Sequence, residues 1–155
     1  MTQAAAVAIS SGDTAWVLMA SALVLLMVPG LAFFYGGLVR NKSALNTMLM
    51  SLGALALITV QWVLWGYSVA FGPGSSWIGS FAWAGMKGVG ATANPTYAAA
   101  LPHILFAAFQ GMFAGITVAL FSGAVIDRMR FAAYLAFGLL WSTFVYDPLA
   151  HWVWG

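Results

Sequence analysis

Long stretches without charge constrain this chain more than any other feature of its sequence. No Asp, Glu, Lys or Arg occurs between Asp13 and Arg40, and none occurs between Lys42 and Lys87. A helix crosses a bilayer with about 20 mainly apolar residues, so each stretch is long enough to do so. Charged residues make up 5% of the chain, against about 25% in a typical soluble domain. The sequence therefore predicts a chain embedded in lipid.

The pattern of apolar runs predicts an all-α, polytopic transmembrane helix bundle. Four spans are expected, at about residues 14–36, 44–71, 103–126 and 131–148. Pro29 predicts a kink in the first span, which is tolerated where neighbouring helices cover the freed carbonyl. The segment Gly72–Pro102 is rich in Gly, Ser, Pro and Thr. We expect it to form a long connection with a short interfacial helix near Trp77–Met86.

The basic residues predict how the chain is oriented. With four spans, the loops that carry Arg40, Lys42, Arg128 and Arg130 lie on one side of the membrane, and Lys87 lies on the other. Lys and Arg favour the cytoplasmic side. We therefore expect a multi-pass protein of the plasma (inner) membrane with its N-terminus outside.

Several classes of function are disfavoured by the residues present. Cysteine is absent, and the sequence shows no carboxylate pair on one helix face, no nucleophile motif and no phosphate-binding loop. His103 and His151 are too far apart in sequence to predict a metal site. Asp13, Asp127 and Asp147 are expected at the edges of spans, which leaves no ionisable group inside the membrane to drive proton-coupled pumping. The sequence predicts no enzyme, no cofactor and, without a basic stripe, no binding of nucleic acid.

An aromatic stripe marks the third expected span. Phe106, Phe109 and Phe113 recur at spacings of three and four, so they share one helical face, and Gln110 is adjacent. Two interpretations are open at this point. The rings pack against lipid or the protein core, or they plug a narrow pore and exclude water and hydrated ions.

Two further features of the expected spans also allow two interpretations each. Trp152 and Trp154 belong to the aromatic belt at the membrane surface, or they attract a small cation at a pore mouth by about 0.5–2 kcal/mol. Gly111 and Gly115 let another helix approach closely, and this helix can come from the same chain or from another copy.

Four segments, in this order, resemble the ammonium transporter (Amt/Rh) family, in particular its prokaryotic Amt members. These segments are FFYGGLVRNKSALN (33–46), QWVLWGYSVAFG (61–72), FQGMFAGITVAL (109–120) and LLWSTFVYDPLAHWVWG (139–155). The resemblance covers nearly the whole chain. It identifies residues 1–155 as the N-terminal part of an ammonium transporter domain.

The resemblance implies an eleven-helix fold with an inverted internal repeat, assembled as a homotrimer with one pore per subunit. It implies that Phe113 is a phenylalanine of the stacked pore gate, with Phe109 and Gln110 beside it. It implies that Trp154 is the tryptophan of the outer site that recruits ammonium. Since an ammonium ion is costly to bury in a medium of low dielectric and neutral ammonia is not, the expected path is deprotonation followed by passage of ammonia.

The resemblance also implies parts that lie beyond Gly155. These are the pore histidines, the second gate phenylalanine and the cytoplasmic tail that contacts PII-type signal proteins. We therefore expect the chain to be a partial sequence of a transporter. Two alternatives are an Amt-like module that binds or senses ammonium without transporting it, and a subunit that pairs with a separately encoded second half.

Overall fold

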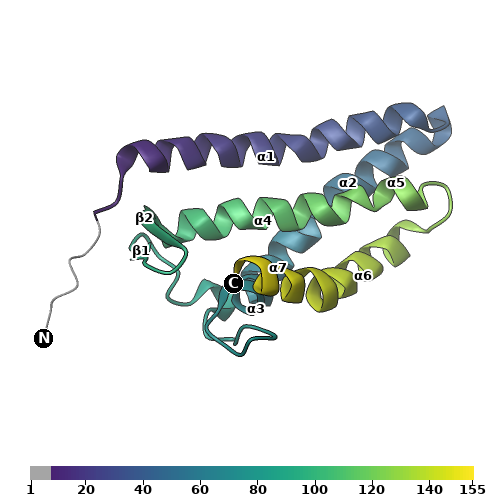
Figure 1. The fold of residues 1–155 in the computed structure, drawn as a ribbon. Coiled ribbons are helices and arrows are strands. Elements are labelled where there is room, and N and C mark those ends of the chain that lie inside the picture. The colour runs from purple at the N-terminus through teal and green to yellow at the C-terminus, as the bar shows by residue number, and fades with distance from the viewer. Residues whose placement is uncertain (1–7) are drawn as a thin grey trace, which may run out of the picture.

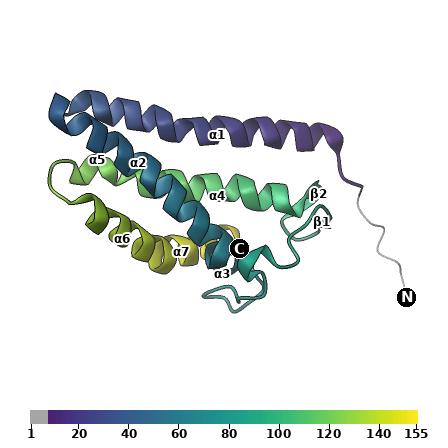
Figure 2. The same cartoon turned by 180° about the vertical axis from the view of Figure 1, so that it is seen from behind.

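A computed structural model of the chain describes residues 8–155, which form a bundle of helices (Figure 1). The helices are α1 (Ser11–Leu38), α2 (Asn41–Gln61), α3 (Tyr67–Phe71), α4 (His103–Leu120), α5 (Ser122–Val125), α6 (Phe131–Trp141) and α7 (Asp147–Trp154). Helix α2 packs against α1, α4 and α6, and in the view from behind it crosses in front of α4 (Figure 2). The all-α bundle expected from the apolar runs is therefore the architecture of the described chain.

Two of the helical runs pass through a π-turn. The π-turn η1 (Trp62–Gly66) joins α2 to α3, and the π-turn η3 (Ser142–Tyr146) joins α6 to α7. A π-turn inserts one extra residue into the helical repeat and often marks a functional position. Because neither turn ends its helix, α2–η1–α3 and α6–η3–α7 are each continuous.

The helices cover the places where spans are expected. Within residues 8–155, three helices are long and apolar enough to cross a membrane, namely Ser11–Leu38, Asn41–Phe71 and His103–Val125. The fourth expected span, 131–148, lies on the continuous run α6–η3–α7, in which Ser142, Thr143 and Asp147 lower the hydropathy. The exact boundaries of the spans stay a prediction. Helix α1 continues as one helix through Pro29.

The connection between α3 and α4 differs from the expectation. Its expected interfacial helix near Trp77–Met86 is reduced to a single 3₁₀ turn, η2 (Ala84–Met86). Around this turn the chain forms an isolated bridge between Gly74 and Gly79 and a small antiparallel pair of strands. These strands are β1 (Ala93–Asn94) and β2 (Ala98–Pro102). A longer helix is excluded because Gly85 and Met86 both have positive φ angles, 63° and 60°.

The glycines of α4 serve packing within the chain. A Cβ at Gly115 would lie 2.8 Å from Cδ1 of Leu55 on α2, and a Cβ at Gly111 would lie 2.8 Å from Cδ1 of Trp62 on η1. Of the two interpretations of this pair, the structure therefore supports close approach of a helix from the same chain. The core beside them holds the fully buried Ala54 and Ala114.

The two ends of the bundle differ in charge. The short loop between α1 and α2 carries Arg40, and the loop between α5 and α6 carries Arg128 and Arg130; both loops lie at the same end (Figure 1). These side chains and that of Lys42 are exposed. We call this the basic end. The opposite end holds the connection between α3 and α4, and we call it the aromatic end.

Candidate functional site

The expected gate residues lie on one part of α4. Phe109, Gln110 and Phe113 are half-buried. The rings of Phe109 and Phe113 meet edge to face, with 5.1 Å between their centroids. Phe106 does not continue this pair, because its ring stacks on Tyr97 at 5.8 Å. The aromatic stripe of the third span is thus divided between two places.

Trp154 lines a groove that also reaches α4. The groove has a volume of about 240 Å³, and residues of α6, η3 and α7 line it together with Thr117 of α4. Thr117 is one helical turn beyond Phe113, and its hydroxyl donates to the Phe113 carbonyl at 2.7 Å. Trp154 is 51% exposed. The expected cation-binding indole therefore lines the same apolar groove as the turn that follows the expected gate.

Trp152, which was the other candidate for cation binding, is used for a structural contact. Its indole N–H donates to the carbonyl of Trp77 at 2.8 Å, and the two indole rings meet edge to face. Beside it, Nδ1 and Nε2 of His151 lie 2.9 Å and 2.8 Å from the carbonyl oxygens of Ala70 and Ser75. These contacts hold the end of α7 against the connection that follows α3.

His103 lies in a cluster of rings at the aromatic end. It is 5% exposed, its Nε2 lies 2.6 Å from the hydroxyl of Tyr67, and the ring of Trp83 packs edge-on against it. A structural role of this kind is the usual one for a lone histidine near the end of a span. Burial raises the pKa of the nearby Tyr97 hydroxyl above its ordinary value, so this phenol stays neutral. Over the described residues 8–155, no three of His, Asp, Glu and Cys are grouped to hold a metal ion.

Asp147, which was expected at the edge of a span, is the first residue of α7. Its side chain is fully buried, at the point where the π-turn η3 leads directly into α7. One carboxylate oxygen of Asp147 lies 2.6 Å from the side-chain amide of Gln61. The only available signal in the sequence was that both residues are polar within otherwise apolar runs.

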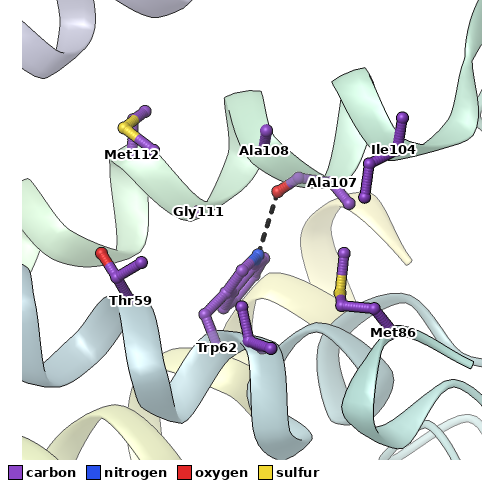
Figure 3. Close-up of a pocket in the computed structure, with 9 residues that line it drawn as sticks. Thr59, Trp62, Met86, Ile104, Ala107, Ala108, Gly111 and Met112 are labelled. Atoms are coloured by element: carbon purple, nitrogen blue, oxygen red, sulfur yellow. Dashed lines mark hydrogen bonds between the residues drawn. The ribbon is translucent and has the colours of Figure 1, made fainter.

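A second, apolar cavity lies between α2 and α4 (Figure 3). It has a volume of about 190 Å³, and the indole of Trp62 forms one wall. The indole N–H donates to the carbonyl of Ala107 at 3.0 Å. None of the expected site residues lines this cavity.

Comparison with known proteins places the chain in a family. The model of the Ammonium Transporter Family matches residues 15–155. The chain belongs to the ammonium transporter family. It is 50% identical over 144 residues to an ammonium transporter of Bacillus subtilis, covering 93% of this chain and 35% of that protein. It is 54% identical over 160 aligned positions to an ammonium transporter of Mycobacterium tuberculosis, covering 92% of this chain and 33% of that protein.

Solved structures of the same family share the fold of this ammonium transporter family member. Mep2 of Saccharomyces cerevisiae matches 95% of the chain with a TM-score of 0.84 and 41% identity, and the match covers 32% of Mep2. Mep2 of Candida albicans matches 95% of the chain with a TM-score of 0.83 and 37% identity. The fold class expected from the sequence, a multi-pass helical membrane protein, is thereby confirmed. The chain spans about a third of the length of these relatives.

Proposed function

We propose that this chain is the N-terminal part of a protein that transports ammonium, or conducts ammonia, across the plasma (inner) membrane. The observation that carries the proposal is the match of residues 15–155 to the ammonium transporter family, together with about half the positions identical to bacterial ammonium transporters. Those relatives are named as transporters, which favours a non-enzymatic role. No observation favours a sensing module that does not transport.

The groove and the gate residues support two successive steps for the substrate, namely binding of a cation and then passage through an apolar constriction. The exposed indole of Trp154 is positioned to hold a small cation by its π-face and to release it toward α4. The edge-to-face pair Phe109 and Phe113 then offers an apolar constriction, with Gln110 beside it. An ammonium ion is strongly disfavoured in such surroundings, whereas neutral ammonia is not. This arrangement favours deprotonation before passage.

The proposal includes the orientation and partners that the family resemblance implies. The grouping of Arg40, Lys42, Arg128 and Arg130 at one end supports a cytoplasmic basic end and an external N-terminus. The extreme N-terminus, residues 1–7, lies outside the described part of the chain. We further propose a homotrimer, and contacts with PII-type signal proteins through segments beyond Gly155. The groove beside Trp154 is then completed by those later segments.

Uptake of methylammonium into proteoliposomes that contain the full-length protein tests the recruiting role of Trp154. We expect the Trp154→Leu substitution to raise the KM for methylammonium, because the leucine side chain has no π-face for the cation. Trp16→Leu is the matched control, since Trp16 is exposed on α1 and lies far from the groove. Wild-type uptake by the Trp154→Leu protein would remove Trp154 from the site.

The same assay tests the gate. We expect Phe113→Ala to change conduction and ion selectivity, because truncation of the ring opens the apolar constriction. Phe81→Ala removes an exposed ring from the connection between α3 and α4, and it is the control. If Phe113→Ala retained wild-type uptake and selectivity, Phe113 would not be a gate residue.

A further inference from the structure

Asp147 is the buried acid of this chain. Asp13 and Asp127 are exposed, whereas the Asp147 side chain is 0% exposed. Its Oδ2 lies 2.6 Å from the side-chain amide of Gln61 at the end of α2. Its Oδ1 is buried and has no hydrogen-bond partner in the described part of the chain. Because this chain's own residues already enclose Oδ1, segments beyond Gly155 do not reach it without opening the packing.

No cation is placed to balance a negative charge on Asp147. The basic residues lie in loops or at helix ends, and within residues 8–155 none forms an ion pair with Asp147. These residues are Arg40, Lys42, Lys87, Arg128 and Arg130, and their side chains are all exposed. A buried carboxylate without a cation and with one oxygen unbonded is much less stable than the neutral acid.

The other groups near Asp147 do not supply the missing charge. Gln61 of α2 is neutral, and so are the hydroxyl groups of Ser142 and Thr143, which lie within 3.5 Å of its amide group. On its own run, Tyr146 is a phenol, and the His151 ring faces two backbone carbonyl oxygens instead of the carboxyl group.

The length of the contact with Gln61 is compatible with a hydrogen carried by the acid. A separation of 2.6 Å lies in the usual range for O–H···O bonds, about 2.5–3.0 Å, and below the usual range for N–H···O bonds, about 2.7–3.2 Å. The nitrogen and oxygen of a glutamine amide are interchangeable in shape, and the hydrogen-bond network decides their assignment. As placed, Nε2 of Gln61 faces Asp147 and lies 3.5 Å from the hydroxyl of Thr143, and Oε1 lies 3.5 Å from the hydroxyl of Ser142. With the amide reversed, Oε1 faces the acid and Nε2 faces the hydroxyl of Ser142, which can accept a hydrogen bond.

We propose that Asp147 is a proton-binding site inside the bundle, which holds its proton at neutral pH and donates it to Oε1 of Gln61. The acid and the amide then form an uncharged lock between α7 and α2. The lock joins the two π-turns, since η1 begins directly after Gln61 and η3 ends directly before Asp147.

Infrared difference spectroscopy of the full-length protein in liposomes tests this site. At neutral pH, we expect the wild-type spectrum minus that of Asp147→Asn to show the carbonyl band of a protonated carboxylic acid. Carboxylate bands in its place would overturn the proposal. Asp127→Asn is the matched control because it removes an exposed acid, and it should remove carboxylate bands only.

A second variant keeps the proposal falsifiable if Asp147→Asn does not fold. In Gln61→Met, the acid loses its acceptor, so its carbonyl band should move relative to the wild-type band. An unchanged acid band in this variant would show that Gln61 is not the partner. A change in carboxylate bands on this substitution, with no change in the acid region, would show that Asp147 is ionised and would overturn the proposal.

Discussion

The two ends of the bundle are built in different ways. At the basic end, short loops carry exposed arginines, and residues such as Arg128 and Arg130 contact little of the protein. At the aromatic end, the connection between α3 and α4 is held by packed rings and by hydrogen bonds to His103 and from Trp152. The comparison indicates that the exposed basic residues of one end set the orientation in the membrane. The packed rings and hydrogen bonds of the other end contribute more to the free energy of unfolding.

The largest effect is expected from Trp62 at the aromatic end. Its side chain is 3% exposed, packs against Tyr67 and Phe71, and donates to the Ala107 carbonyl. We expect Trp62→Ala to lower the free energy of unfolding by about 3–5 kcal/mol, because the buried indole leaves a cavity. Denaturant unfolding in detergent micelles measures the change. The exposed Trp16 provides the control, and a loss for Trp62→Ala no larger than for Trp16→Ala would contradict the packing.

A smaller effect is expected from single hydroxyl groups, and the two ends provide a matched pair. Tyr67→Phe at the aromatic end removes the contact with the buried His103 and should cost about 1–2 kcal/mol. Tyr35→Phe at the basic end removes only an exposed, 3.5 Å contact with the Leu120 carbonyl and should cost less than about 0.5 kcal/mol. Thermal unfolding of both variants gives the comparison. Equal losses would mean that the two ends do not differ as described.

The smallest effect on stability is expected from the arginines of the basic end. The double variant Arg128→Gln and Arg130→Gln should change the free energy of unfolding by less than about 0.5 kcal/mol, since both side chains are exposed. It should instead let a fraction of the molecules insert with inverted orientation, because half of the basic residues at this end are lost.

Labelling of an introduced cysteine measures this orientation. Asn41→Cys places a thiol at the start of α2 at the basic end, in a chain segment that has no cysteine of its own. A thiol reagent that does not cross membranes should label it from outside only in the double variant. Lys87→Gln is the control, since it strengthens the charge asymmetry. External labelling of Asn41→Cys without the arginine substitutions would refute the proposed topology.

Particular residues show where prediction from the sequence succeeded and where it did not. The helices follow the uncharged runs, because segments of this length and hydropathy have little alternative in lipid. The expected helix near Trp77–Met86 was not found, since backbone hydrogen bonds between the connection and the end of α3 replace it. Phe106 leaves the expected stripe because Tyr97, nine residues earlier in the chain, offers a ring to stack on.

Composition and the spacing of charges were enough to specify a helical membrane protein with one basic end. The reason is that the apolar and charged residues of each segment decide by themselves whether it prefers lipid or water. The pairing of Asp147 with Gln61, 86 positions apart, depended on the packing of α7 against α3, which follows the end of α2. The π-turn η3 directly precedes Asp147, and a one-residue change of helical repeat is invisible in a pattern of apolar residues. Long-range polar contacts of this kind exist only once the helices have docked.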